Sequence, residues 1–173
     1  MRKELFFTLV IVCTVTHIIR SVYEILKHKQ ALKPGKLSFT VIFINMLFLW
    51  ISWFLLCKYD IYNISLPGII RYIGISLSFI GVIVFLTGLL TIKTLESYEG
   101  DLITSGIYSK IRHPMYLGFI LWLIGFPLYF GAFFSIFLSL LYITNILFWK
   151  YLEEKELEKR FPGYQDYKKT TIF

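Results

Sequence analysis

The chain has 173 residues, of which 57% are hydrophobic and 19% are aromatic. A water-soluble fold of this size could not bury so much apolar surface, so the composition excludes a soluble globular protein and indicates several membrane spans. The formal net charge is +7, but the cations lie in short segments between apolar runs, which indicates membrane topology and argues against nucleic acid as a partner. We expect one membrane-embedded domain over residues 1–173.

Three apolar runs in the first half are each long enough to cross the hydrocarbon core as a helix: residues 5–26, 37–57 and 69–92. No small-residue cleavage site follows the first run, so we expect a span there and no signal peptide. A Pro-Gly pair precedes the second run and another precedes the third, which is typical of helix boundaries.

A polar segment, residues 93–112, separates these runs from a second apolar stretch over residues 115–149. Gly125, Pro127 and Gly131 interrupt this stretch, and a helix that stopped before Pro127 would be only about 18 Å long, too short to span alone. We expect a helical hairpin, formed either by two short tilted spans or by a re-entrant pair. The predicted fold class is an all-α integral membrane protein with about five transmembrane helices, the last two in this hairpin, and a cytoplasmic C-terminal helix.

The distribution of cations predicts the orientation. If the N-terminus lies outside, most of the 18 lysines and arginines fall on the cytoplasmic side. The polar segment and the C-terminal tail are then both cytoplasmic.

Glycines recur every seven residues in the third run and in the hairpin, at Gly74, Gly81 and Gly88 and at Gly118 and Gly125. Seven residues are close to two helical turns, so each set marks one helix face. We expect close helix packing through these small residues. The alternative is a face that leaves room for a ligand or a lipid tail.

Arg112, His113 and Pro114 stand where the polar segment meets the hairpin. An ordinary helix start at the membrane interface accounts for Arg112 and Pro114. The functional interpretation is an anion site, in which free backbone N–H groups, the helix dipole and two side-chain donors bind a carboxylate or a phosphate.

Glu153 interrupts an apolar helix face in the tail, where residues spaced by four are Trp149, Leu157 and Phe161. A carboxylate on such a face is costly without a cationic partner, for which the candidates are Arg112, His113, Lys150 or a bound cation. Glu154 falls on a different face beside Lys150, and we expect it to be solvated. S-adenosylmethionine carries a carboxylate, an ammonium and a sulfonium group, so it matches both the anion site and Glu153. No Cys or His spacing is typical of a metal site.

At these residues the sequence resembles the isoprenylcysteine carboxyl methyltransferases and the related membrane phospholipid methyltransferases. The similarity covers about residues 102–169 and includes LITSGIYSKIRHPMYLG, then EEKEL and FPGYQDY after the hairpin. The resemblance implies a helical membrane methyltransferase that uses S-adenosylmethionine, bound in a cytoplasm-facing pocket between the hairpin and the C-terminal segment.

Carried over residue by residue, the resemblance implies cofactor-binding roles for Tyr108, His113, Tyr116, Leu117 and Glu153. It implies catalytic roles for Arg112 at the helix entry and for the acidic pair Glu153 and Glu154. Lys150 stands near the position where family members often have an arginine.

The expected reaction is methyl transfer to a lipid or prenylated acceptor, with a carboxylate as the acceptor group and a phospholipid amine as the alternative. We expect the substrate tail to enter from the bilayer between the third run and the hairpin. An NADPH-dependent sterol or steroid reductase is the other enzyme class considered, because those proteins share a similar Arg-His-Pro-like region. A small membrane transporter is the non-enzymatic alternative, for which His17 and Asn145 are the polar residues nearest mid-membrane depth. The sequence carries no signal for an oligomeric state.

Overall fold

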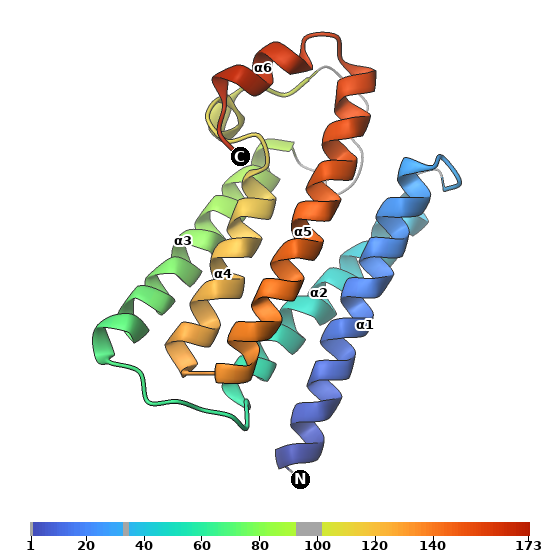
Figure 1. Ribbon diagram of the computed structural model, residues 1–173. Coiled ribbons are helices and arrows are strands. Elements are labelled where there is room, and N and C mark those ends of the chain that lie inside the picture. Colours follow the sequence, from blue (N-terminus) through green and yellow to red (C-terminus); the bar gives the residue numbers. More distant parts are fainter. Residues whose placement is uncertain (1, 33–34, 93–101) are drawn as a thin grey trace.

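The computed structural model describes residues 2–32, 35–92 and 102–173 and is helical throughout its main body (Figure 1). Its elements in chain order are α1 (Arg2–His28), α2 (Lys36–Lys58), α3 (Gly68–Ile92), the 3-10 helix η1 (Gly106–Ser109), α4 (Pro114–Phe130), α5 (Phe133–Arg160) and α6 (Tyr164–Thr170). Pro34 and residues 93–101, which belong to a predicted helix boundary and to the predicted polar segment, lie outside the described residues.

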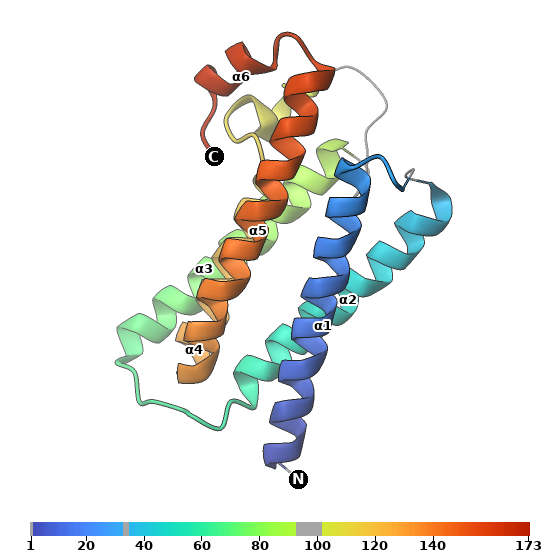
Figure 2. The same ribbon diagram turned by 45° about the vertical axis from the view of Figure 1, so that its right-hand side comes forward.

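Four of the described helices, α1, α2, α3 and α5, are long and apolar enough to cross a membrane, whereas α4 has 17 residues and is shorter. This confirms the all-helical membrane class. The five helices α1 to α5, α4 included, run in alternating directions, so the two termini lie at opposite ends of the bundle (Figures 1 and 2). Which end faces the cytoplasm stays a prediction from the cation distribution.

The hairpin consists of one short arm and one long arm, and the prediction of two short helices is wrong for α5. Pro127 lies within the last turn of α4, which continues to Phe130 and is capped by Gly131 in the left-handed conformation, at φ 68°. Only two residues connect the arms, so the end of α4 lies beside the start of α5. Because α4 has 17 residues and α5 has 28, α5 extends well beyond the other end of α4. The excess length carries the last turns of α5 past the start of α4, beside Arg112 and His113.

The glycine faces of α3 and α4 pack against each other, as predicted. A Cβ atom at Gly74 would lie 2.6 Å from the backbone nitrogen of Tyr129, and one at Gly81 would lie 2.6 Å from the carbonyl oxygen of Gly118. These distances are shorter than real Cβ contacts, so the two backbones touch through glycine alone. The seam has no room for a lipid tail, and the prediction that the substrate enters between the third span and the hairpin is wrong along it.

Asp60 joins the α2–α3 connection to the N-terminus of α5 at the end of the bundle away from the C-terminus (Figure 1). Its side chain is fully buried and accepts hydrogen bonds from the backbone N–H and the hydroxyl of Ser135, at 2.9 and 2.8 Å. The carboxylate therefore satisfies a free N–H in the first turn of α5 and complements the helix dipole.

His17 and Asn145, the polar residues considered for transport, form part of the packed core. The ring of His17 stacks on Tyr142 at a centroid distance of 4.0 Å, and its Nδ1 lies 3.2 Å from the side-chain nitrogen of Asn145. Asn145 also accepts a hydrogen bond from Ser21. His17 is buried and Asn145 is half-buried, and these contacts place both in a hydrogen-bonded cluster between α1 and α5, in which the Nε2 of His17 has no hydrogen-bond partner among the described residues.

Candidate functional site

A cavity lies at the end of the bundle that holds the C-terminal segment. The space open to the centre of a water molecule is about 140 Å³, and the walls come from α1, α2, α3, η1, α4, α5 and α6. Five of the predicted site residues line it: Tyr108, Arg112, His113, Tyr116 and Glu153. Leu117 and Glu154 are not among the lining residues. The sequence motifs therefore converge on one cavity, although the chain separates them by up to 45 residues.

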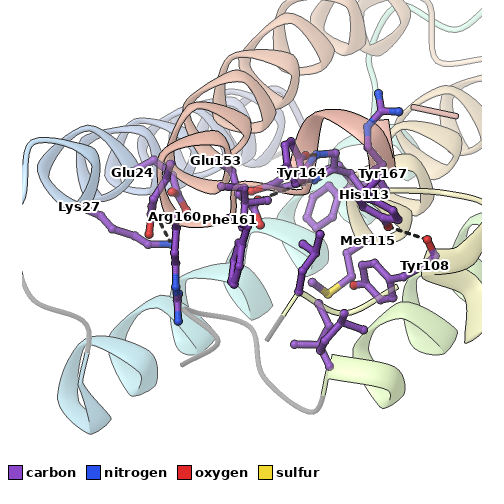
Figure 3. A pocket seen from close by; sticks show the side chains of 18 of the residues that line it. Glu24, Lys27, Tyr108, His113, Met115, Glu153, Arg160, Phe161, Tyr164 and Tyr167 are labelled. Carbon is purple, nitrogen blue, oxygen red and sulfur yellow. Dashed lines mark hydrogen bonds and ion pairs between the residues drawn. The ribbon is translucent and has the colours of Figure 1, made fainter. Parts of the chain in front are cut away.

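His113 and Glu153 face each other across the middle of the cavity (Figure 3). His113 is the N-cap residue of α4, is 5% exposed and lies over the ring of Tyr116 at a centroid distance of 5.7 Å. Its Nδ1 is 4.0 Å from a carboxylate oxygen of Glu153, whose side chain is 35% exposed. Glu153 thus retains a solvent-accessible carboxylate that is free to contact a ligand.

Of the partners expected for Glu153, His113 contacts both acids, whereas Arg112 and Lys150 contact Glu154 instead. One carboxylate oxygen lies 3.4 Å from Arg112 Nε, 3.3 Å from His113 Nε2 and 3.3 Å from Lys150 Nζ, and the other lies 2.8 Å from Lys168 Nζ. Glu154 is only 8% exposed, so the prediction that it is solvated is wrong. At Glu154, α5 has extended beyond the start of α4. The C-terminal segment folds over the outward face of α5 there and buries Glu154.

Arg112 anchors the end of the chain against the start of α4. Its Nη1 donates to the carbonyl oxygens of Lys168 and Thr171, at 3.0 and 2.6 Å. Its backbone N–H donates to Ile172, and the N–H of Ile172 donates to Lys110. The guanidinium therefore connects Glu154 on α5 with the tail, and the tail closes one side of the cavity.

Three tyrosines form the wall of the cavity beside His113 (Figure 3). Tyr108 is 5% exposed, and its hydroxyl has no hydrogen-bond partner among the described residues. The hydroxyl of Tyr167 donates to the carbonyl oxygen of Tyr108, and that of Tyr164 lies 3.5 Å from His113 Nε2. Burial raises the pKa of Tyr108 and of Tyr164, so both remain neutral hydroxyls well above neutral pH.

The motif analysis missed a wall that α1 contributes through Arg20, Glu24 and Lys27. Arg20 and Glu24 form an ion pair one helical turn apart and are 8% and 4% exposed. The available signal was an acid and a base spaced by four inside an apolar run, where an unpaired charge is costly. In the sequence, Arg20 and Lys27 counted only toward the predicted orientation.

Comparison with known proteins identifies the family. The phospholipid methyltransferase family matches residues 69–163, which is more than half of the chain and extends from α3 to the start of α6. A stretch of 54 residues is 37% identical to a protein named Protein-S-isoprenylcysteine O-methyltransferase from Schizosaccharomyces pombe. That stretch covers 31% of this chain and only 21% of the relative. No solved structure matches the chain. The chain belongs to the phospholipid methyltransferase family.

Proposed function

We propose that the protein transfers a methyl group from S-adenosylmethionine to a lipid or prenylated acceptor, and that the acceptor group is a carboxylate. The observation that carries this proposal is the cavity itself. It joins an accessible carboxylate, Glu153, to His113 and Tyr116 within the residues that match the family. The name of the yeast relative supports a prenylcysteine carboxylate as the acceptor.

The residues around the cavity fit S-adenosylmethionine. The buried Tyr108 hydroxyl, which lacks a partner among the described residues, is available to a polar group of the ligand. The half-buried ring of Tyr167 offers an aromatic surface for an adenine base. Glu153 offers a negative charge for a sulfonium or an ammonium group. Tyr108, His113, Tyr116, Glu153 and Tyr164 are the residues that would hold the cofactor.

An apolar wall supports an acceptor with a hydrocarbon chain. Met46 from α2, Phe85 from α3, and Met115 and Phe119 from α4 line the same cavity as His113 and Glu153. Because the seam between α3 and α4 is closed, this wall lies where α2 faces the α3–α4 pair. A prenyl or acyl chain bound there would lie beside the polar groups that hold the reacting end.

When bound, S-adenosylmethionine would supply an electrophilic methyl group: an acceptor carboxylate oxygen would form a bond to the methyl carbon as the carbon–sulfur bond breaks, which would give a methyl ester and a neutral thioether. The protein's contribution is then to align and desolvate the two reactants, since an ionised carboxylate needs no base. His113 and Glu153 bind and orient the cofactor, and the tyrosine wall excludes water from the cavity. Arg112 and Glu154 act as positioning residues, because their mutual contacts hold the tail against α5.

A phospholipid amine is the second candidate acceptor, and the family description favours it. An amine must lose a proton to become a nucleophile, so this reaction requires a general base. Glu153 is the candidate, since its side chain is partly exposed and its contact with His113 is long, at 4.0 Å.

Equilibrium titration of the purified protein with S-adenosylmethionine and, separately, with NADPH tests the proposal. We expect saturable binding of S-adenosylmethionine and no saturable binding of NADPH. The variants Glu153→Gln and His113→Ala should each weaken it by about tenfold or more, as expected for the loss of a hydrogen bond to a charged group. Asp166→Asn is the matched control, because that carboxylate is 84% exposed on α6. Saturable NADPH binding without S-adenosylmethionine binding would favour the reductase and overturn the proposal.

A further inference from the structure

Arg20 is a buried cation that the proposed cofactor site does not use. It lies on α1, outside the residues that match the family, and is 8% exposed. One terminal nitrogen pairs with Glu24, and the guanidinium lies over the rings of Tyr23 and Trp149, at 5.4 and 5.8 Å from their centroids. Its Nε is buried and has no hydrogen-bond partner among the described residues.

A buried donor without a partner is costly in a protein interior, and more so on a charged group. Arg20 lines the cavity, so a ligand in the cavity lies next to its guanidinium group. A guanidinium group has only hydrogen-bond donors, so its partner must be an acceptor. Oxygen anions are the strongest acceptors.

The α1 wall forms a second polar end of the cavity, distinct from the tyrosine wall. Figure 3 shows Glu24, Lys27 and Arg160 together on one side and His113, Tyr108 and Tyr167 on the other, with Glu153 and Phe161 between them. Tyr116 interacts with both Arg20 and Glu153, so the two ends meet at this residue. A group bound at Arg20 would therefore lie next to the centre of the cavity, where His113 faces Glu153.

The described charges at this end favour an anion. Arg20, Lys27 and Arg160 are cationic, whereas Glu24 and Glu156 are anionic. The two acids are already opposed by cations, since Glu24 pairs with Arg20 and Glu156 lies 3.9 Å from Lys27. Arg160 has no carboxylate within ion-pair distance in the part of the chain that the structure describes, and its guanidinium lies over Phe161. Three cations therefore face two acids at this end, and Glu153, which lies between the two ends, also acts on Arg20.

We propose that Arg20 binds an anionic oxygen group of the methyl acceptor, a carboxylate or a phosphate, and so selects the acceptor headgroup. This inference rests on the proposed function, because it assigns the α1 end of the cavity to the second substrate. Both candidate acceptors carry such a group: a prenylated cysteine has a carboxylate, and a phospholipid amine lies next to its phosphate.

The test measures two affinities for each variant, one for S-adenosylmethionine and one for an acceptor probe. The probes are an S-farnesylated cysteine with a free carboxylate and phosphatidylethanolamine in detergent micelles. Arg20→Gln removes the cation, and Arg20→Lys keeps the charge opposite Glu24 but lacks the Nε donor. The double variant Arg20→Glu with Glu24→Arg keeps an ion pair on α1 but moves the cation by one turn. Lys58→Gln, an exposed cation at the opposite end of the bundle, is the control.

We expect Arg20→Gln to weaken acceptor binding by about 10- to 100-fold, the range for a hydrogen bond to a charged group, while the affinity for S-adenosylmethionine changes less than about twofold. Arg20→Lys should lose part of the acceptor affinity and remain folded even if Arg20→Gln does not. The probe whose affinity falls, farnesylated cysteine or phospholipid, identifies the anionic group.

Two results would overturn the inference. Full acceptor affinity in the exchanged double variant would show that the ion pair only stabilises α1. Loss of S-adenosylmethionine affinity in Arg20→Lys would assign Arg20 to the cofactor. Failure of the unmodified protein to bind S-adenosylmethionine counts against the proposed function instead, and the affinity of each Arg20 variant for the acceptor probes still decides the inference.

Discussion

The adjacent residues Glu153 and Glu154 should respond in opposite ways to the same substitution. Each is replaced by glutamine, which keeps the shape of the side chain and removes its charge. Glu154 is opposed by Arg112, His113, Lys150 and Lys168 within 3.4 Å. Glu153 lies 4.0 Å from His113 and also interacts with Tyr116 and Arg20.

The magnitude for Glu154 follows from burial. Removing one partner of a fully buried ion pair costs about 3–5 kcal/mol. The side chain of Lys168 is 35% exposed and that of Lys150 is 17% exposed, so water replaces part of the lost interaction, and the glutamine oxygen still accepts one hydrogen bond. We therefore expect Glu154→Gln to cost about 2–3 kcal/mol, which corresponds to a decrease in Tm of roughly 5–10 °C for a chain of this size.

For Glu153→Gln we expect a change in unfolding free energy within about 0.5 kcal/mol, because its contact with His113 is long and its side chain is partly solvated. Its effect appears in binding, as a loss of S-adenosylmethionine affinity. Thermal unfolding in detergent, followed by tryptophan fluorescence, measures the first quantity, and equilibrium titration measures the second. An unchanged Tm for Glu154→Gln, or an equal loss of Tm for both variants, would refute the separation of roles.

Three further predictions concern packing, pH and the opposite end of the bundle. Gly81→Val should destabilise the α3–α4 seam by about 1–3 kcal/mol through overpacking, whereas Gly163→Ala, with no atom within 4 Å of the added Cβ, should leave Tm unchanged. The hydrogen bond to Glu154 raises the pKa of Lys168 above its ordinary value of 10.5, so this contact contributes fully below pH 10.5 and is lost as the pH rises through the folded-state value. Tm measured from pH 8 to 12 should therefore fall above about pH 10.5 in the native protein, and less steeply in Lys168→Gln. Asp60→Asn should lower the stability by about 1–2 kcal/mol, because the neutral amide interacts less strongly with the N–H and hydroxyl of Ser135, and chemical unfolding in detergent would show no change if the cap were unimportant.

The sequence by itself determined the helical membrane class, three of the spans and the motif that names the family. These features are local or compositional: a run of about 20 apolar residues predicts a span wherever it lies, and glycines at a seven-residue interval mark one helix face. The convergence of Tyr108, His113, Tyr116 and Glu153 was also predicted, because the two motifs were expected on the same side of the membrane and matched one ligand.

The tertiary structure alone decided which acid is buried and what α1 contributes. Helical periodicity gives the angle between Glu153 and Glu154 but not what covers each face, and here the returning tail covers Glu154 and leaves Glu153 in the cavity. The unequal hairpin depends on where α4 ends, which the left-handed cap at Gly131 sets and Pro127 does not. Arg20 reaches the site only because α1 packs beside α5, a contact between residues more than 120 positions apart that no local pattern encodes.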